Sequence, residues 1–238
     1  MQEKYVRKKK DELINEINIK NILSEALNNY EIGEYKIAID KYETVLNTNP
    51  TCAEALAGMG NCYMRLQNPE KAESSFIKAK TFDPENYISW LGLGLLELYR
   101  ENTEQAELYL NQAIKINPES DRAYCALGIL NSNTGNFIDA EDYYCQALDL
   151  NISNLIAIQS LIDLSYKMEK FGKASEYLNR FLKIYPANVN ILFSMAGLQF
   201  KMGNIEDSLR TLDNVLSIDP KHKYALEFQK NIRAVLVN

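Results

Sequence analysis

The chain has 238 residues, of which 46% are hydrophobic and 24% charged, and this composition is typical of a folded protein rather than a disordered one. Its formal net charge of −6 argues against nucleic acid as a partner, because nucleic-acid-binding domains carry a clustered basic excess. The four cysteines form no Cys-x-x-Cys pair and His222 is the only histidine, so the spacing predicts neither a metal site nor a cofactor held by such ligands.

Residues 1–18 form a basic segment that we expect to be helical. The run Arg7–Lys10 is the kind of cluster that binds anionic lipid headgroups, at about 1 kcal/mol per charge. Asp11 and Glu12 follow it directly, so a solvated helix is the simpler interpretation and membrane association is peripheral if it occurs at all. The segment lacks the apolar stretch of a signal peptide, and no part of the chain approaches the ~20 apolar residues of a membrane span. We expect a cytoplasmic protein.

From residue 19 onwards the chain repeats itself at an interval of 34 residues. A small residue recurs at Ala38, Ala72, Ala106, Ala140, Ala174 and Ser208, a large apolar one at Tyr42, Phe76, Leu110, Tyr144, Leu178 and Leu212, and a closing proline at Pro50, Pro84, Pro118, Pro186 and Pro220. Spacings of three and four residues place such positions on one face of a helix. Each unit therefore predicts two amphipathic helices, roughly 53–66 and 69–81 in the second unit.

Small residues in the first predicted helix of a unit let two helix axes approach closely. Gly60, Gly94 and Gly128 hold this place, so we expect each glycine to touch the neighbouring helix. The fifth unit departs from the pattern, because Ile162 replaces the small residue and Phe181 replaces a Val or Ala. These departures imply looser or re-angled stacking, and we expect a change of superhelical curvature near residues 150–182.

These columns resemble the tetratricopeptide repeat (TPR) family. The resemblance implies an all-α, right-handed superhelical solenoid of antiparallel helix pairs, with six repeats at 19–52, 53–86, 87–120, 121–154, 155–188 and 189–222. Residues 223–238 are then a C-terminal capping helix with Tyr224, Phe228, Ile232 and Val235 along its apolar stripe.

The same resemblance implies a concave groove made by the first helices, which binds a peptide or an amphipathic helix of another protein. The residues that it places in the groove are Leu23, Leu27, Tyr30, Asn61, Met64, Arg65, Leu91, Leu95, Tyr99, Arg122, Ile129, Asn133, Tyr166, Phe193 and Phe200. Leu95, Tyr99 and Ile129 are expected to form one apolar patch. A carboxylate clamp of the kind that some chaperone-binding members use is disfavoured, since only Asn61 and Arg122 match it.

Catalysis is not expected, because the sequence holds no Gly-rich phosphate loop, no helix-borne metal pair and no arrangement of a nucleophile with a base. The sequence therefore indicates a non-catalytic scaffold or adaptor that binds a partner protein in its groove. The alternative is a self-assembling coat or peripheral scaffold on a membrane or organelle surface, formed through homo-oligomerisation.

Overall fold

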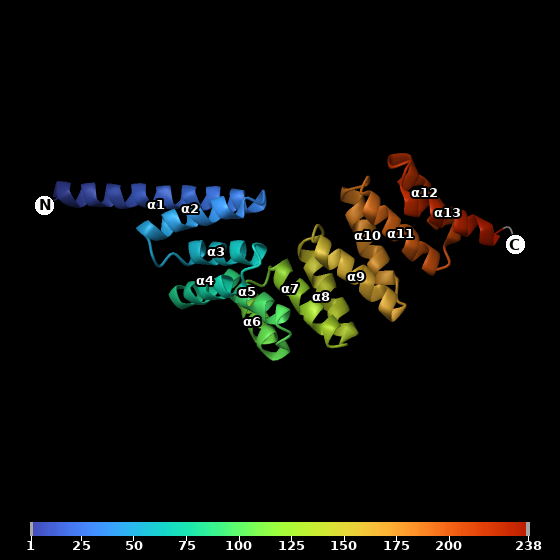
Figure 1. The fold of residues 1–238 in the computed structure, drawn as a ribbon, viewed down its shortest axis with the longest axis horizontal. Coiled ribbons are helices and arrows are strands. Elements are labelled where there is room, and N and C mark those ends of the chain that lie inside the picture. The colour runs from blue at the N-terminus through green and yellow to red at the C-terminus, as the bar shows by residue number, and fades with distance from the viewer. Residues whose placement is uncertain (1, 237–238) are drawn as a thin grey trace. The chain divides into compact units, whose positions relative to one another are not determined.

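A computed structural model describes the backbone of residues 2–236 and the side chains of residues 15–234 and 236. These residues form thirteen α-helices and no strand, which confirms the all-α fold. The chain divides into two compact units, Met1–Pro118 and Glu119–Asn238 (Figure 1). Unit 1 contains α1 (Gln2–Glu31), α2 (Tyr35–Thr48), α3 (Ala53–Arg65), α4 (Pro69–Phe82), α5 (Tyr87–Tyr99) and α6 (Thr103–Ile116). Unit 2 contains α7 (Asp121–Asn133), α8 (Phe137–Leu150), α9 (Leu155–Met168), α10 (Gly172–Ile184), α11 (Val189–Lys201), α12 (Ile205–Ile218) and α13 (Lys223–Leu236).

The helices pack in consecutive pairs, and we call the earlier member of each pair its first helix. α1 packs on α2, α3 on α4 and α5 on α6 in unit 1, and α7 on α8, α9 on α10 and α11 on α12 in unit 2. Within each unit, the second helix of a pair also packs on the first helix of the next pair. The predicted helices 53–66 and 69–81 correspond to α3 and α4 within one residue at each end.

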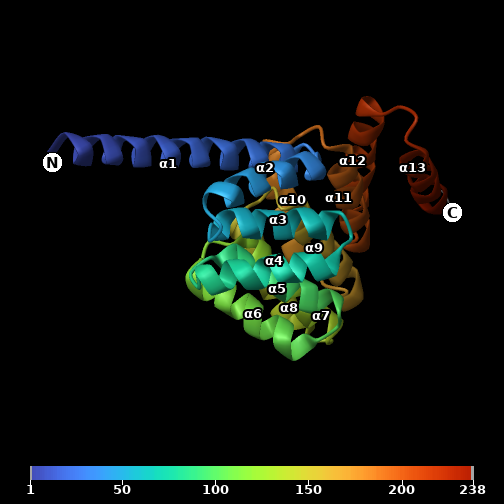
Figure 2. The same cartoon turned by 60° about the vertical axis from the view of Figure 1, so that its left-hand side comes forward.

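Helix α1 is longer than the sequence analysis predicts. It runs without a break from Gln2 to Glu31, so residues 2–18 continue into the first helix of unit 1. Both views show it extending past α2 (Figures 1 and 2). The side chains of Arg7–Lys10 lie outside the described residues.

A left-handed residue ends the first helix of every pair. It recurs at the repeat interval, at Gly33, Gln67, Glu101, Gly135, Glu169 and Gly203, with φ between 54° and 86°. Glycine adopts this conformation without steric cost, whereas other residues are strained by contact of their Cβ with the backbone. Glycine therefore marks only half of these turns in the sequence.

Side-chain caps begin most of the first helices. The side-chain oxygens of Asn86, Ser120, Asn154 and Asn188 each accept a hydrogen bond from the backbone N–H three residues later, at 3.0–3.3 Å. Such a cap satisfies a backbone donor that the helix itself leaves free. Because the caps also recur every 34 residues, each pair begins in the same register.

The glycines of the first helices lie where two helices touch, as predicted. A Cβ atom built on Gly60 would lie 2.5 Å from the ring of Phe76, one on Gly94 would lie 2.7 Å from Leu110 Cδ2, and one on Gly128 would lie 2.5 Å from the ring of Tyr144. Real Cβ atoms do not come this close to other atoms, so any side chain here would push the helices of the pair apart. The large residue of each second helix therefore fills the space that glycine leaves.

The α9–α10 pair lacks this contact. Ile162 stands where the other pairs have a small residue, and Phe181 is buried in the same core. α9 is in much less close contact with α10 than the first helices of the other pairs are with their partners. This confirms the looser packing that the two departures from the repeat pattern predict.

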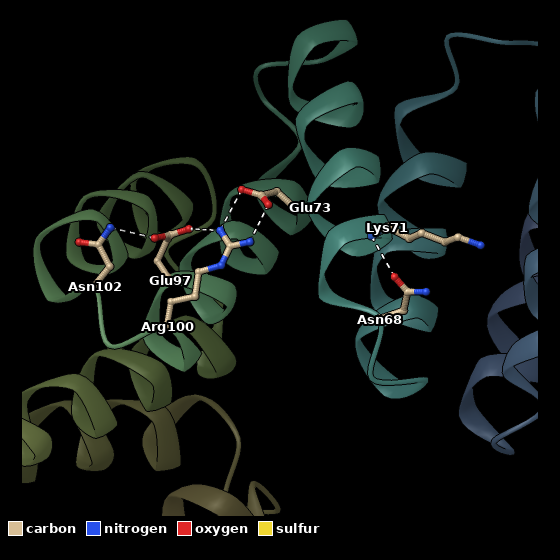
Figure 3. A network of polar contacts seen from close by, with 6 residues as sticks. All are labelled: Asn68, Lys71, Glu73, Glu97, Arg100 and Asn102. Atoms are coloured by element: carbon tan, nitrogen blue, oxygen red, sulfur yellow. Dashed lines mark hydrogen bonds and ion pairs between the residues drawn. The ribbon is translucent and has the colours of Figure 1, made fainter.

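Polar networks tie some helices together at their edges. In unit 1 the Arg100 guanidinium donates to both carboxylate oxygens of Glu73 on α4, at 2.6 and 2.9 Å, and to Glu97 on α5 at 2.7 Å (Figure 3). Asn102 donates to the other oxygen of Glu97 at 2.9 Å (Figure 3). Glu97 is only 8% exposed, and each of its two carboxylate oxygens accepts a hydrogen bond, so the buried charge is compensated.

Helix α13 covers the apolar side of α12, but with a different stripe from the predicted one. Ala225 and Ile232 are buried and Phe228 is half-buried, whereas Tyr224 is 66% exposed. The prediction for Tyr224 is wrong, because the stripe runs through positions 225, 228 and 232 and leaves 224 outside it. The side chain of Val235 lies outside the described residues.

Candidate protein-binding site

The groove residues predicted for unit 1 divide into core and surface. Leu23 and Leu91 are 7% and 2% exposed and belong to the core, Leu23 within the cluster formed by α1, α2 and α3. Leu27 and Tyr99 are 50% and 77% exposed. Asn61, Met64 and Leu95 are half-buried. Among the predicted groove residues of unit 1, the exposed apolar ones are therefore on α1 and α5.

One polar contact joins two of the predicted residues in unit 1. The Nε–H group of Arg65 on α3 donates to the hydroxyl of Tyr30 on α1 at 3.3 Å, and this bond raises the pKa of the guanidinium. The Tyr30 ring also packs on Tyr35, with ring centroids 5.6 Å apart. Tyr30 and Arg65 therefore hold each other in place on neighbouring first helices.

Three predicted residues lie on α7, at the start of unit 2. Arg122 and Asn133 are exposed near opposite ends of this helix, and Ile129 is half-buried against the core of the unit. Leu95 and Tyr99 belong to unit 1, so the predicted patch of these two residues with Ile129 would join residues from both units. That patch stays a prediction.

The structure does bring three predicted residues together in unit 2. Tyr166 on α9, with Phe193 and Phe200 on α11, lines a hollow of about 350 Å³. The rest of the lining consists of Ile162, Ser194, Gly197, Lys201 and Phe228. Pockets that bind ligands share this composition, a mainly apolar and aromatic wall with few polar groups.

Aromatic contacts fix the wall formed by α11 and α13. Phe228 meets the rings of Phe200 and Phe193 nearly edge to face, with centroids 5.3 and 6.3 Å apart. The imidazole of His222 lies 5.1 Å from the Phe193 ring, and its Nδ1 accepts a hydrogen bond from the backbone N–H of Ala225. His222 thereby caps α13 and fixes the start of the helix that carries Phe228.

The opposite wall is formed by Tyr166. A Cβ atom on Gly197 would lie 2.7 Å from its hydroxyl oxygen, so the glycine leaves room for the phenol to reach across to α11. The ring also contacts Phe171, at 5.5 Å between centroids. Burial raises the pKa of the Tyr166 hydroxyl. Even so, the residue stays 40% exposed and accessible from solvent.

The hollow lies between side chains of α9 and α11. The backbones of these two helices come less close to each other than those of α1 and α3, α3 and α5, or α7 and α9. The bulky Ile162 and Tyr166 line the hollow on the α9 side. The departure from the repeat pattern in the fifth unit thus lies beside the hollow.

The sequence analysis missed several lining residues. Phe228 was assigned only to the capping stripe, and Ile162 was noted only as a departure from the small-residue column. The signal that could have found them is the repeat register. A capping helix follows α12 as the first helix of another pair would, so its aromatic side chains lie beside those of α11.

Other kinds of site find no support in the described residues. They hold no cluster of three or more His, Cys, Asp or Glu side chains that could bind a metal ion. Among the same residues, no helix has the length and apolar character needed to cross a membrane. Burial raises the pKa of the Cys62 and Cys145 thiols to about 11 and that of Cys125 to about 12, which favours the protonated thiol at neutral pH.

Solved structures of known proteins share the fold. PilF of Pseudomonas aeruginosa is 20% identical with a TM-score of 0.70, over 91% of this chain and 99% of that one. PilW, a type IV pilus biogenesis factor, is 18% identical with a TM-score of 0.70, over 88% and 97%. Yeast Tom70 is 18% identical with a TM-score of 0.64, over 92% of this chain and 47% of that one. At these identities the likeness shows the fold alone.

Two family models match the sequence itself. The model of the tetratricopeptide repeat protein 21 C-terminal ARM domain matches residues 4–191, well over half of the chain, and a tetratricopeptide repeat model matches residues 165–232. Together with the helix pairs and their 34-residue register, these matches show that the chain belongs to the tetratricopeptide repeat family.

Proposed function

We propose that this protein is a non-catalytic scaffold that holds a partner through the aromatic hollow of unit 2. Tetratricopeptide repeat proteins bind other proteins, and their fold supports an interaction scaffold in general. The observation that carries the proposal is the convergence of Tyr166, Phe193 and Phe200 on one hollow that remains open to solvent. A peptide or helix of the partner inserts an apolar side chain there.

Aromatic side chains that line a pocket suit this role on energetic grounds. They offer a large apolar area with few rotatable bonds, so little conformational entropy is lost on binding. Truncation of a central aromatic anchor commonly costs about 2 kcal/mol or more of binding free energy. Tyr166 is the best residue to test, because it is the most exposed of the three predicted aromatic residues.

The test begins with the capture of partners from native lysate and their identification. Tyr166→Ala is then expected to weaken binding of the captured partner about 30-fold, measured by calorimetry, with little change in the helical circular dichroism signal. Tyr224→Ala is the matched control, since this tyrosine is exposed on α13 and does not line the hollow. Wild-type affinity of Tyr166→Ala would contradict the proposal. Loss of affinity in Tyr99→Ala instead would move the site to the predicted patch.

Self-assembly is the second candidate function, and exposed apolar side chains of α13 favour it. Leu226 and Leu236 are 47% and 60% exposed on this helix. A second copy would cover them. Sedimentation velocity over a range of protein concentrations should then show oligomers that grow without added partner, and Leu226→Glu should abolish them. A monomer at every concentration excludes this function.

A further inference from the structure

The charge at the rim of the hollow is unbalanced. Of the described residues that line it, Lys201 alone carries a charge. It is exposed in the last turn of α11, and no described carboxylate lies within ion-pair distance of its ammonium group. Lys167 takes the equivalent place on α9, 34 residues earlier, and lies 5.9 Å from the centre of the Phe137 ring.

The repeat register explains why Lys201 lacks a partner on its own helix. On α9, Asp163 precedes Lys167 by one turn, at the position from which a carboxylate can reach a lysine, and it accepts a hydrogen bond from Gln159 at 2.9 Å. On α11 the place equivalent to Asp163 is Gly197, which makes room for Tyr166. The glycine that shapes the hollow therefore also places no carboxylate one turn before Lys201.

The charged groups of the neighbouring helix do not fill this role. Glu227 on α13 lies beside Phe228 in the sequence, but it faces a different depression together with Lys223 and Lys230. Those two lysines surround it with positive charge. Among the residues that line the hollow, Lys201 therefore supplies the one full charge, and this charge favours a negative group on whatever enters.

The chain itself shows which apolar group the wall accepts. Phe228 projects from an amphipathic helix and seats its ring against the edges of Phe193 and Phe200. A partner helix that lies beside α13 would present its own anchor to the remaining surface of Phe200 and Tyr166. An aromatic or long aliphatic side chain matches these walls.

Resting on the proposed function, we infer that the occupant is an acidic amphipathic helix of a partner protein, with an aromatic or long aliphatic anchor in the hollow and an Asp or Glu one turn away that pairs with Lys201. Positions one turn apart lie on the same helix face, so one segment can make both contacts. The carboxylate belongs to a side chain within the helix, which distinguishes this site from a clamp for a chain terminus.

The inference is tested with two fluorescein-labelled synthetic helical peptides. Each carries a single Phe anchor on an otherwise alanine- and glutamine-rich sequence, and they differ only in Glu or Lys one turn from the Phe. Fluorescence anisotropy with the full chain is expected to show about 3- to 5-fold tighter binding of the Glu peptide, as for an ion pair near the surface. Higher salt should remove this preference.

Charge reversal provides the decisive variant. Lys201→Glu is expected to reverse the order of the two peptides, whereas Lys183→Glu, the same change at an exposed site on α10, should leave the order unchanged. Equal binding of the two peptides, or an unchanged preference in Lys201→Glu, overturns the inference. Binding of neither peptide also overturns it.

The two proposals fail in different ways. If both peptides bind equally and Tyr166→Ala weakens both, the hollow is a binding site without charge selection, and only the inference about Lys201 is lost. If Tyr166→Ala has no effect on the partner captured from lysate, the proposed function itself is lost. A preference for the Lys peptide would identify a basic occupant and reject the acidic one.

Discussion

The α5–α6 and α9–α10 pairs show two ways of building the same repeat. In α5–α6, Gly94 lets α5 approach until its backbone meets Leu110. In α9–α10, Ile162 occupies the equivalent position, and the two helices are in much less close contact. The same residue that prevents close packing also forms part of the wall of the hollow. The repeat that gives up close helix contact is thus the one that borders the hollow proposed to bind a partner.

The largest loss of stability is expected from removing the Phe76 ring, which fills the space left by two glycines. Phe76 is fully buried, with Gly60 on α3 and Gly92 on α5 both against its ring. Phe76→Ala should lower the free energy of unfolding by about 3–5 kcal/mol, because no side chain can move into the cavity. Urea denaturation measures this. Phe82→Ala, at an exposed site of the same helix, should cost far less, and equal losses would show that the glycine contact is unimportant.

A larger side chain at the glycine position should lower the free energy of unfolding by less than Phe76→Ala does. It should, however, distinguish the close α5–α6 pair from the looser α9–α10 pair more clearly. Gly94→Leu forces a side chain against Leu110 and should lower the free energy of unfolding by about 1–3 kcal/mol. Ile162→Leu keeps the side-chain volume in the looser pair and should cost less than about 1.5 kcal/mol. Gly172→Ala is the control, since nothing lies within 4 Å of its added Cβ. An unchanged thermal midpoint in Gly94→Leu would contradict the assigned contact.

Loss of the Arg100 network in unit 1 should also lower the free energy of unfolding by more than loss of the Lys173 ion pairs between α8 and α10. Arg100→Ala leaves the buried Glu97 without its cation and should cost about 1–3 kcal/mol. Lys173 bridges Glu141 and Asp142 at a more exposed site, between α10 and α8, so Lys173→Ala should cost less than about 1 kcal/mol. Chemical denaturation of both variants, alone and combined, checks the order.

The decrease of stability at low pH should also depend on the Arg100 network. The hydrogen bond from Arg100 lowers the pKa of Glu73 below its ordinary value of 4.5. The unfolded chain therefore binds a proton at a higher pH than the folded one, and this part of the stability is lost as the pH falls from about 4.5 through the lowered pKa. Arg100→Ala should flatten the decline in that range, and parallel curves for variant and wild type would argue against the pairing.

The smallest expected effect is an increase in stability, at the turn between α9 and α10. Glu169 holds the left-handed turn between α9 and α10, with φ at 54°. Glu169→Gly should raise the free energy of unfolding by about 0.5–1 kcal/mol by relieving the strain on its Cβ. Glu176→Gly, inside α10, should instead lose about 1 kcal/mol. A loss in both variants would mean that the turn depends on contacts of the glutamate side chain.

Much of the fold could be predicted because each repeat obeys local rules. Apolar spacing predicts α3 and α4 almost to the residue. α4 begins at Pro69, and the Asn68 side chain accepts a hydrogen bond from the Lys71 backbone N–H, an arrangement that these two residue types favour (Figure 3). The glycine contacts follow from size alone. Left-handed turns at Gln67, Glu101 and Glu169 could not be predicted from residue type, because packing of the repeat imposes that conformation against local preference.

The proposed binding surface is harder to predict, since the exposure of its residues depends on how closely neighbouring helices approach. Leu91 and Tyr99 share one helix and the same apolar character, yet one is in the core and the other is 77% exposed. Phe228 joins the hollow only because α13 continues the register past the sixth repeat. Residue type marks candidates, and the spacing between helices decides which of them solvent can reach.

The weak α9–α10 packing also has a consequence for how the chain opens. In an array held together by nearest-neighbour contacts, partial unfolding starts at the interface that costs least to separate. α10 makes limited contact with both α9 and α11, so local unfolding of unit 2 should begin at α10, before α7 and α8 separate. In native-state hydrogen exchange, the amide hydrogens of α10 should exchange through a local opening whose free energy is well below the free energy of global unfolding. The wall of the hollow formed by α9 would then move relative to α11 in the folded protein, and a bound partner would slow that exchange.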